Sequence, residues 1–347
     1  MKNNNEIHLL DLAYSLKKSH IKLGLAFLNR LLQNASKSNK PHRKLEFANT
    51  VGCPINKTKK SATTIKGWMT GYRTIPMSKL IKIVELSDYT WQDVADSLIY
   101  IKAGIRKGEV KPNFPITIDE KIGSIVGHIL GDGSIDICNH NIFFSNSNGE
   151  LLREFRNYMK EIFGIEPRIW IQKKANFGNT QWLRRAKNLD NLPKGNNVGL
   201  FYPKICTDIL YVLFGKFAEG KVKKITPETI NCNLQFKKGL IRAFFDDEGS
   251  VRYDSHTVRF HQDNKELLKG IRLILEDLGI NSHEIKSYTK RNKLRHYFNV
   301  TGFKEYYVFY NGIGCTSSKK AKEFELLINK VQNSRNFKKK FALTIGS

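Results

Sequence analysis

Two features are absent from this 347-residue chain: a long apolar run and any pattern of paired cysteines. No stretch approaches the ~18 uninterrupted apolar residues that a membrane-spanning helix requires, and the N-terminus has no signal-peptide core. The five cysteines are scattered and form no CxxC pair, which argues against a zinc knuckle or a disulfide framework. We therefore expect a protein without membrane contact that resides in the reducing cytoplasm.

Acidic residues are also scarce. The chain has 32 Asp and Glu but 58 Lys and Arg, which gives a formal net charge of +26. Such an excess is typical of proteins that bind a polyanion, either nucleic acid or an acidic membrane surface. No amphipathic helix with a basic face opposite a Trp/Phe face stands out, so nucleic acid is the expected partner. A generally basic composition without such a partner is the alternative.

Glycine and proline suggest where the domains begin and end. Residues 1–108 read as an all-α domain, and the breaker-rich segment 109–115 reads as a linker. After it, a pattern of helix, short strands and helix occurs twice. The first copy is expected over residues 116–235, and the second over 236–347, where it ends in a basic C-terminal helix.

Residues 45–86 resemble a helix-turn-helix of the phage-repressor type. A short helix over Leu45–Cys53 ends in glycine, and the rest of the unit follows over Ser61–Leu86. A serine-capped helix is followed by a glycine turn and by a helix that starts at proline. Ile65 and Trp68 would pack inward, so the opposite face would enter the major groove. The residues on that face are Thr63, Thr64 and Lys66. The basic segment Pro54–Lys60 lengthens the turn that precedes the serine-capped helix, and a plain helical bundle is the alternative.

The most informative pattern is a repeat in which an apolar helix ends in a carboxylate, a glycine and a serine. IVGHILGDGS occupies Ile125–Ser134, and IRAFFDDEGS occupies Ile241–Ser250. Their acids, Asp132 and Glu248, are 116 residues apart, and strand and helix patterns downstream keep nearly the same spacing. A duplicated unit with one acid per copy predicts a pseudo-symmetric site between two halves. Such a site suits a substrate that is itself two-fold symmetric, and duplex DNA is the obvious one.

The glycines of the first motif predict how the two motif helices meet. Gly127 and Gly131 lie four residues apart on one helix face. Because a glycine inside a helix costs about 1 kcal/mol relative to alanine, two on one face are best explained by the close approach of another helix. The second motif has Ala243 and Asp247 at the matching positions. We expect these four residues to form the interface.

The placement of the two acids predicts a divalent metal. Asp132 and Glu248 are expected in the last turns of their helices, where a carboxylate opposes the helix dipole by roughly 0.3–1 kcal/mol. Two such acids would repel each other, and a cation between them would remove the repulsion. Oxygen-only ligands favour Mg²⁺ over zinc or copper. Mg²⁺ can activate water and neutralise charge on a phosphodiester.

IVGHILGDG and IRAFFDDEG both resemble the LAGLIDADG (DOD-type) motif of homing endonucleases, in its two-motif monomeric form. The resemblance spans roughly residues 116–332. It implies an α+β fold, a duplicated αββαββα unit with internal pseudo-two-fold symmetry, here preceded by the all-α domain. It also implies a monomeric, Mg²⁺-dependent endonuclease that hydrolyses phosphodiester bonds of double-stranded DNA, as in intron homing. Asp132 and Glu248 would then be the catalytic and metal-binding acids.

The resemblance further implies one lysine per half that assists the reaction. The stretch VKKITPETI gives Lys223, with Lys224 as the alternate, and NGIGCTSSKKAKEFELL gives Lys320, with Lys319 as the alternate. A positive charge there can stabilise the pentavalent phosphate or lower the pKa of the attacking water. A solvated basic surface is the alternative interpretation of these lysines.

In the family, the strands form a saddle in the major groove, whose polar side chains contact bases and whose basic side chains contact phosphates. The residues of this chain that the resemblance places there are Arg168, Gln172, Arg252, Arg259, Lys286, Lys290 and Arg291.

The second motif departs from the family pattern. Ala243 replaces the usual glycine, and Asp247 replaces a small residue, where it would crowd the helices or add a carboxylate near the metal. Asp246 is expected to cap or orient rather than to catalyse. Two alternative functions fit the same scaffold: a non-catalytic transcription regulator and an RNA-splicing maturase. The ends lack His-Asn-Cys splice-junction residues, so we do not expect an intein.

Overall fold

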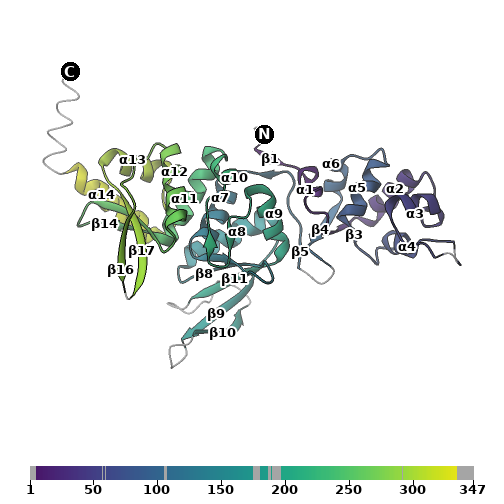
Figure 1. Ribbon diagram of the computed structural model, residues 1–347, viewed down its shortest axis with the longest axis horizontal. Helices are drawn as coiled ribbons and strands as arrows, with labels where there is room; N and C mark the ends of the chain where they lie inside the picture. Colours follow the sequence, from purple (N-terminus) through teal and green to yellow (C-terminus); the bar gives the residue numbers. More distant parts are fainter. Residues whose placement is uncertain are drawn as a thin grey trace, which may run out of the picture. The chain divides into compact units, whose positions relative to one another are not determined.

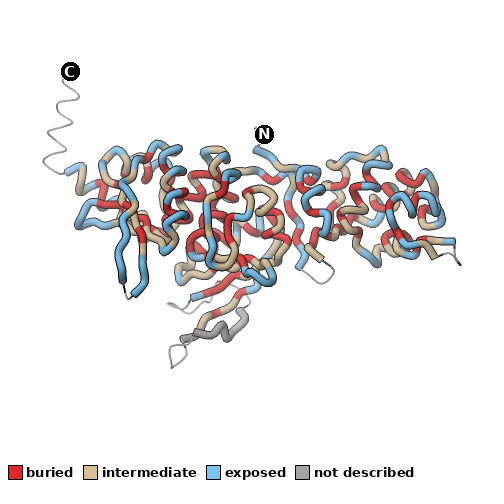
Figure 2. Tube along the Cα trace, in the orientation of Figure 1, coloured by how far each residue is buried: buried red, intermediate tan, exposed pale blue. Residues whose placement is uncertain are grey.

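The computed structural model describes residues 5–333, apart from residues 57, 59, 105–107, 175–179, 187–188, 190–196 and 291. The chain divides into two compact units. Their helices and strands are labelled in Figure 1. The first consists of residues 1–117, 161–165 and 203–212, and the second of residues 118–160, 166–202 and 213–347. Buried residues run through the interior of each unit (Figure 2). No helix among the described residues is long and apolar enough to cross a membrane.

The first unit combines short helices with an antiparallel sheet. Its helices are α1 (Leu9–Ala13), α2 (Leu25–Ser36), α3 (Leu45–Val51), α4 (Thr63–Met69), α5 (Met77–Glu85) and α6 (Trp91–Asp96), with a 3-10 turn at Pro41–Arg43. Its sheet has the order β3-β2-β4-β5 and consists of β3 (Ile75–Pro76), β2 (His20–Leu23), β4 (Leu98–Lys102) and β5 (Glu109–Val110). The short strands β1 (Glu6–Ile7) and β6 (Ile116–Thr117) form a separate pair.

The prediction of an all-α N-terminal domain is therefore wrong. In β2 the buried Ile21 and Leu23 alternate with half-buried neighbours, which is the two-residue period of a strand. β4 is rich in the β-branched and aromatic residues that strands favour. These strands have only two to five residues each, so their pattern does not stand out between helices. β5 also lies inside the segment that was expected to be a linker.

α4 has the inward face that the sequence predicts. Ile65 is 0% exposed and Trp68 is 1% exposed. The indole Nε1 of Trp68 donates a hydrogen bond to the carbonyl of Thr74 at 3.1 Å. Residues 52–62 separate α3 from α4 and contain an isolated antiparallel bridge between Asn56 and Ser61.

The rest of the chain repeats helix, strands and helix. In the first half these are α7 (Glu120–Leu130), β7 (Gly133–Ile135), β8 (Ile142–Asn146), α8 (Gly149–Phe163), β9 (Arg168–Lys174), β10 (Thr180–Ala186), β11 (Val198–Tyr202) and α9 (Lys204–Phe214). The hairpin of β12 (Ala218–Glu219) and β13 (Val222–Lys223) and the short helix α10 (Pro227–Ile230) follow. In the second half they are α11 (Leu234–Glu248), β14 (Gly249–Arg252), β15 (Thr257–Gln262), α12 (Lys265–Asp277), β16 (Lys286–Lys290), β17 (Lys293–Val300), α13 (Phe303–Gly312) and α14 (Ser318–Gln332).

Each half has its own antiparallel sheet, with the orders β10-β9-β11-β8-β7 and β14-β15-β17-β16. The repeated phenylalanines Phe144 and Phe260 lie on the inner faces of these sheets and are both fully buried. Phe260 stacks on Phe298 with ring centroids 4.9 Å apart. The α+β class and the duplicated arrangement are as predicted, with β11 as an additional strand in the first half.

The motif helices α7 and α11 pack closely against each other. Side chains cap both: the carboxylate of Asp119 accepts from the backbone N–H of Lys121 at 2.9 Å, and Asn233 caps α11 in the same way. A methyl group on Gly239 would overlap the carbonyl of Glu120, and one on Gly127 would overlap the carbonyl of Leu240. Glycine therefore sets the short distance between the helices, and this distance brings the two motif ends together.

Candidate functional site

The two motif acids lie at the paired ends of α7 and α11. Glu248 is the last residue of α11 and is half-buried, whereas Asp132 lies just beyond the end of α7 and is exposed. The sequence placed Asp132 in the last helical turn, but α7 ends at Leu130 because Gly131 leaves the helical conformation. The backbone N–H of Asp132 donates to Oδ2 of Asp247 at 3.3 Å, which links the two motifs directly.

Each acid accepts a hydrogen bond from an amide side chain of its own half. Nδ2 of Asn146, at the end of β8, lies 2.9 Å from Oδ2 of Asp132 and 3.3 Å from Oδ1 of Asp247. Nε2 of Gln262, at the end of β15, donates to Oε1 of Glu248 at 2.6 Å. Sequence reasoning missed both amides. The repeat could have identified them, because Asn146 and Gln262 are 116 residues apart, the same spacing as Asp132 and Glu248.

Each half also brings one lysine to its motif. The ammonium of Lys223 donates to the carbonyl of Gly131, immediately before Asp132. Nζ of Lys320 donates to the carbonyls of Phe245 at 2.8 Å and Asp246 at 2.6 Å. Desolvation lowers the pKa of both lysines, although nearby carboxylates oppose the shift. The alternates Lys224 and Lys319 are exposed, and Lys319 faces Glu323 at 3.9 Å.

The carboxylates at this point are electrostatically crowded. Although part of the Asp132 side chain reaches solvent, desolvation by its surroundings, followed by the charges of Asp247 and Glu248, raises its pKa to about 7. Desolvation also raises the pKa of Glu248, with Lys223 opposing and Asp247 adding to the shift. A bound cation would reverse both effects, because it favours the ionised carboxylates.

The donor set fits a hard divalent cation. No group of three or more His, Cys, Asp or Glu side chains is arranged to hold a metal within the described part of the chain. Mg²⁺ does not require such a group, because it keeps several waters and is usually bound through one or two carboxylates plus substrate phosphates. Asp132 and Glu248 supply two carboxylates at the motif ends, and both retain access to solvent.

The carboxylate of Asp247 forms an ion pair with His128 of the facing motif helix. Its Oδ2 lies 3.0 Å from Nδ1 of His128, and Nε2 of His128 lies 3.4 Å from Oε2 of Glu154. The His128 and Asp247 side chains are both 0% exposed. Burial disfavours the charged imidazolium, but Asp247 and Glu154 prevail and raise the pKa of His128 to about 10. His128 therefore carries a charge that compensates Asp247.

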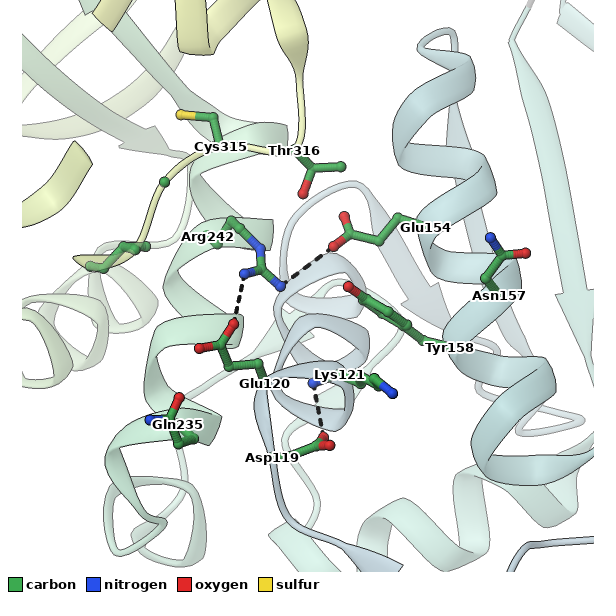
Figure 3. A pocket seen from close by; sticks show the side chains of 12 residues that line it. Asp119, Glu120, Lys121, Glu154, Asn157, Tyr158, Gln235, Arg242, Cys315 and Thr316 are labelled. Carbon is green, nitrogen blue, oxygen red and sulfur yellow. Dashed lines mark hydrogen bonds and ion pairs between the residues drawn. The ribbon is translucent and has the colours of Figure 1, made fainter. Parts of the chain in front are cut away.

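The buried charges continue to a pocket of about 750 Å³ beside the same helix pair (Figure 3). Arg242 lies between Oε2 of Glu120 at 2.9 Å and Oε1 of Glu154 at 3.5 Å. Positive and negative side chains thus alternate in a chain of contacts. It runs from Arg242 in the pocket to Glu154, then to His128 and finally to Asp247. Two of the three helices involved are the motif helices α7 and α11, and the third, α8, supplies Glu154.

A family model of the LAGLIDADG-like domain matches residues 119–194 and 235–341, which is more than half of the chain. The protein belongs to this LAGLIDADG-like family. Both acids and both amides lie in the matched segments, as does Lys320, whereas Lys223 lies between them.

Individual relatives of this LAGLIDADG-like protein are distant. It is 24% identical over 259 residues to the DNA-directed RNA polymerase subunit Rpo1C of Methanocaldococcus jannaschii; this region is 74% of the chain but only 26% of that relative. Among solved structures it is similar to the homing endonuclease I-DmoI in complex with DNA and Mn (13% identity, TM-score 0.38), covering 57% of this chain and 98% of that one. It is also similar to full-length DUF199/WhiA from Thermatoga maritima (18% identity, TM-score 0.40), covering 66% and 67%.

Asp246 of the second LAGLIDADG motif is held by backbone groups. Its carboxylate accepts from the N–H of Thr316 at 2.7 Å and of Ser317 at 3.2 Å, directly before α14. It is 4% exposed, and burial raises its pKa to about 6. This contact anchors α14 and so positions Lys320, in keeping with the expected orienting role.

The expected DNA-contacting residues of the LAGLIDADG halves fall into two groups. Four are exposed on strands of the two sheets: Arg168, Arg252, Lys286 and Lys290. Two are already engaged: Nε of Arg259 donates to Asn299 at 2.9 Å, and Oε1 of Gln172 accepts from Asn197 at 2.9 Å. Arg291 lies outside the described residues.

The remaining expected contacts belong to the first unit, which lies largely outside the LAGLIDADG match. Thr63 and Lys66 are exposed on α4, and Thr64 is half-buried. The long connection between α3 and α4 differs from the short turn of a helix-turn-helix, so the groove-binding role of these three residues stays a prediction.

Proposed function

We propose that this protein is a site-specific endonuclease that hydrolyses phosphodiester bonds of double-stranded DNA with a divalent metal, Mg²⁺. The observation that supports this most is the pairing at the ends of α7 and α11. Each half contributes one acid, one amide that hydrogen-bonds to it and one partly desolvated lysine. Two such sets suit a substrate with two equivalent strands.

In this proposal the side chains have separate tasks. Asp132 and Glu248 hold the metal, which when bound neutralises phosphate charge and activates water. Asn146 and Gln262 fix the orientation of these carboxylates through their hydrogen bonds. Preorganisation of this kind lowers the reorganisation needed during the reaction.

The two lysines supply positive charge near the scissile phosphates. Lys223 and Lys320 are held by backbone carbonyls at the two motif ends. In the charged form they can stabilise negative charge as it develops. Because desolvation lowers the pKa of both, they can also exchange a proton with the attacking water. The exposed basic residues of the two sheets would contact the DNA backbone, and one chain with two halves would act as a monomer.

A library of random sequences tests this without a chosen target. A plasmid library with a randomised insert is incubated with the protein and Mg²⁺, and new DNA ends are captured and sequenced. We expect ends at one recurrent sequence with the parent protein, and none with the Asp132→Asn/Glu248→Gln variant or in EDTA. Asp254→Asn, which removes an exposed acid from the β14–β15 turn, is the matched control and should cut like the parent.

Two results would refute the endonuclease. One is the absence of Mg²⁺-dependent ends from the parent, and the other is equal cutting by the double variant. Sequence-specific binding of duplex DNA without cutting would favour the transcription regulator. Processing of an intron-containing RNA would favour the maturase.

A further inference from the structure

The first unit contains a second hollow, separate from the motif acids. It has a volume of about 620 Å³, within the ~300–1,000 Å³ range of ligand pockets. Strands β2 and β4 and the turn after α4 line it. Four of its lining residues are basic, namely His20, Lys22, Arg73 and Lys102, and none of the described lining residues is acidic.

The strands place two basic residues, His20 and Lys102, directly opposite each other. His20 pairs with Lys102 and Lys22 pairs with Tyr100 in the antiparallel register of β2 and β4. Facing basic residues in a sheet are unfavourable, and desolvation together with Lys102 lowers the pKa of His20. Lys102 has one ion-pair contact with the half-exposed Glu109, at 3.8 Å. The positive charge around the hollow is therefore poorly compensated within the unit, so an anion would fit here.

An aromatic ring stands at the rim of the same hollow. Tyr72 is 85% exposed, the largest exposed fraction among the large apolar side chains of the described residues. The ammonium of Lys22 donates to the carbonyl of Gly71, which has a left-handed φ of 71°. This contact holds the turn that presents Tyr72 and the exposed Arg73.

We propose that this hollow binds single-stranded nucleic acid, with phosphates on Lys22, Arg73 and Lys102 and an unpaired base stacked on Tyr72. A basic groove beside an exposed aromatic ring is the arrangement with which proteins hold single strands, because every base offers a face for stacking. In a duplex the bases stack on one another, so a ring outside the grooves has no base to cover it. This site lies in a different unit from Asp132 and Glu248 and does not depend on the cleavage activity.

The test measures binding of a short fluorescent oligothymidylate to the full-length protein in EDTA, where no metal-dependent cutting occurs. Tyr72→Ala should raise the Kd about fivefold or more, since base stacking on an aromatic ring contributes ~1–3 kcal/mol. Tyr72→Phe, which keeps the ring, should bind like the parent. A duplex probe should lose little affinity with either variant.

Charge is tested by a matched pair of arginines in the same unit. Arg73→Gln should weaken binding and reduce the salt dependence (log Kd against log salt) by about 0.7, the value for one phosphate contact on a single strand. Arg43→Gln, which removes an exposed charge outside the hollow, should change neither quantity. The proposal is overturned if Tyr72→Ala binds like the parent, if Tyr72→Phe loses as much as Tyr72→Ala, or if the two arginine variants weaken binding equally.

Discussion

Replacing His128 by Gln should strongly destabilise the second unit. Few other substitutions of a charged residue by an uncharged one should cost as much stability there. The imidazolium is fully buried between Asp247 at 3.0 Å and Glu154 at 3.4 Å. Glutamine keeps a similar polar shape but removes the positive charge. Two buried carboxylates would then lose the cation that they share.

The structure limits the size of this effect. Removing one partner of a buried ion pair costs about 3–5 kcal/mol, because the other charge stays buried without compensation. Asp247 would keep hydrogen bonds from Asn146 and from the Asp132 backbone, and Glu154 would keep Arg242. We therefore expect a loss near the lower end, about 3 kcal/mol of the free energy of unfolding.

Urea unfolding of four proteins measures this loss and its origin: the parent, His128→Gln, Asp247→Asn and the double variant. The double variant should be more stable than the sum of the single effects predicts, by at least about 1 kcal/mol, because it removes both charges. His296→Gln is the control, since His296 is also buried but bonds the hydroxyl of Ser287 at 2.8 Å instead of a carboxylate. It should lose only about 1 kcal/mol, the usual net value of one hydrogen bond.

Two results would contradict a charged His128 paired with Asp247. A His128→Gln loss no larger than that of His296→Gln would mean that the imidazole is neutral in the folded protein. Strict additivity in the cycle would mean that His128 and Asp247 do not interact.

Further predictions concern pH, metal, packing and the amides. Because the pKa of His128 is raised from 6.5 to about 10, its contribution to stability is complete below pH 6.5 and is lost as pH rises through 10; unfolding of His128→Gln should lack this part of the decline. Mg²⁺ should raise the midpoint of thermal unfolding, less so as pH falls through about 7, where Asp132 takes up a proton, and Asp132→Asn should abolish the shift. Gly239→Ala should destabilise by at least about 1 kcal/mol because its methyl overlaps the facing helix. Gly312→Ala, in a helix but with open space around it, should be neutral or stabilising by up to about 1 kcal/mol in the same urea assay. Gln262→Ala should slow cutting of one strand more than the other, so that nicked plasmid accumulates on gels; equal slowing of both strands would contradict the assignment of one set of residues per strand.

Much of the second unit could be predicted from local and periodic features of the sequence. The motif helices, the repeat and the approach at Gly127 all follow from residue spacing, because a helix places residues four apart on one face. The acids and the two lysines were located through the repeat and the family resemblance. The same 116-residue spacing also contained Asn146 and Gln262, which an alignment of the two copies could have found.

The strands of the first unit and the partners of the second motif depended on the tertiary structure. β2 and β4 are short, and they pair through residues about 80 positions apart, such as His20 with Lys102. His128 and Asp247 are 119 residues apart in the chain. By itself, His128 reads as one residue of an apolar helix and Asp247 as an unfavourable replacement. The packing of α7 on α11 turns them into a compensated pair.

The sequence by itself therefore determined the family, the duplication and the two acids, since these depend on local spacing and on motif identity. Only the tertiary structure decided which charges are compensated and which remain available to a ligand. The physical reason is that burial and charge pairing depend on neighbours from distant segments, and no periodic pattern in the chain records those neighbours.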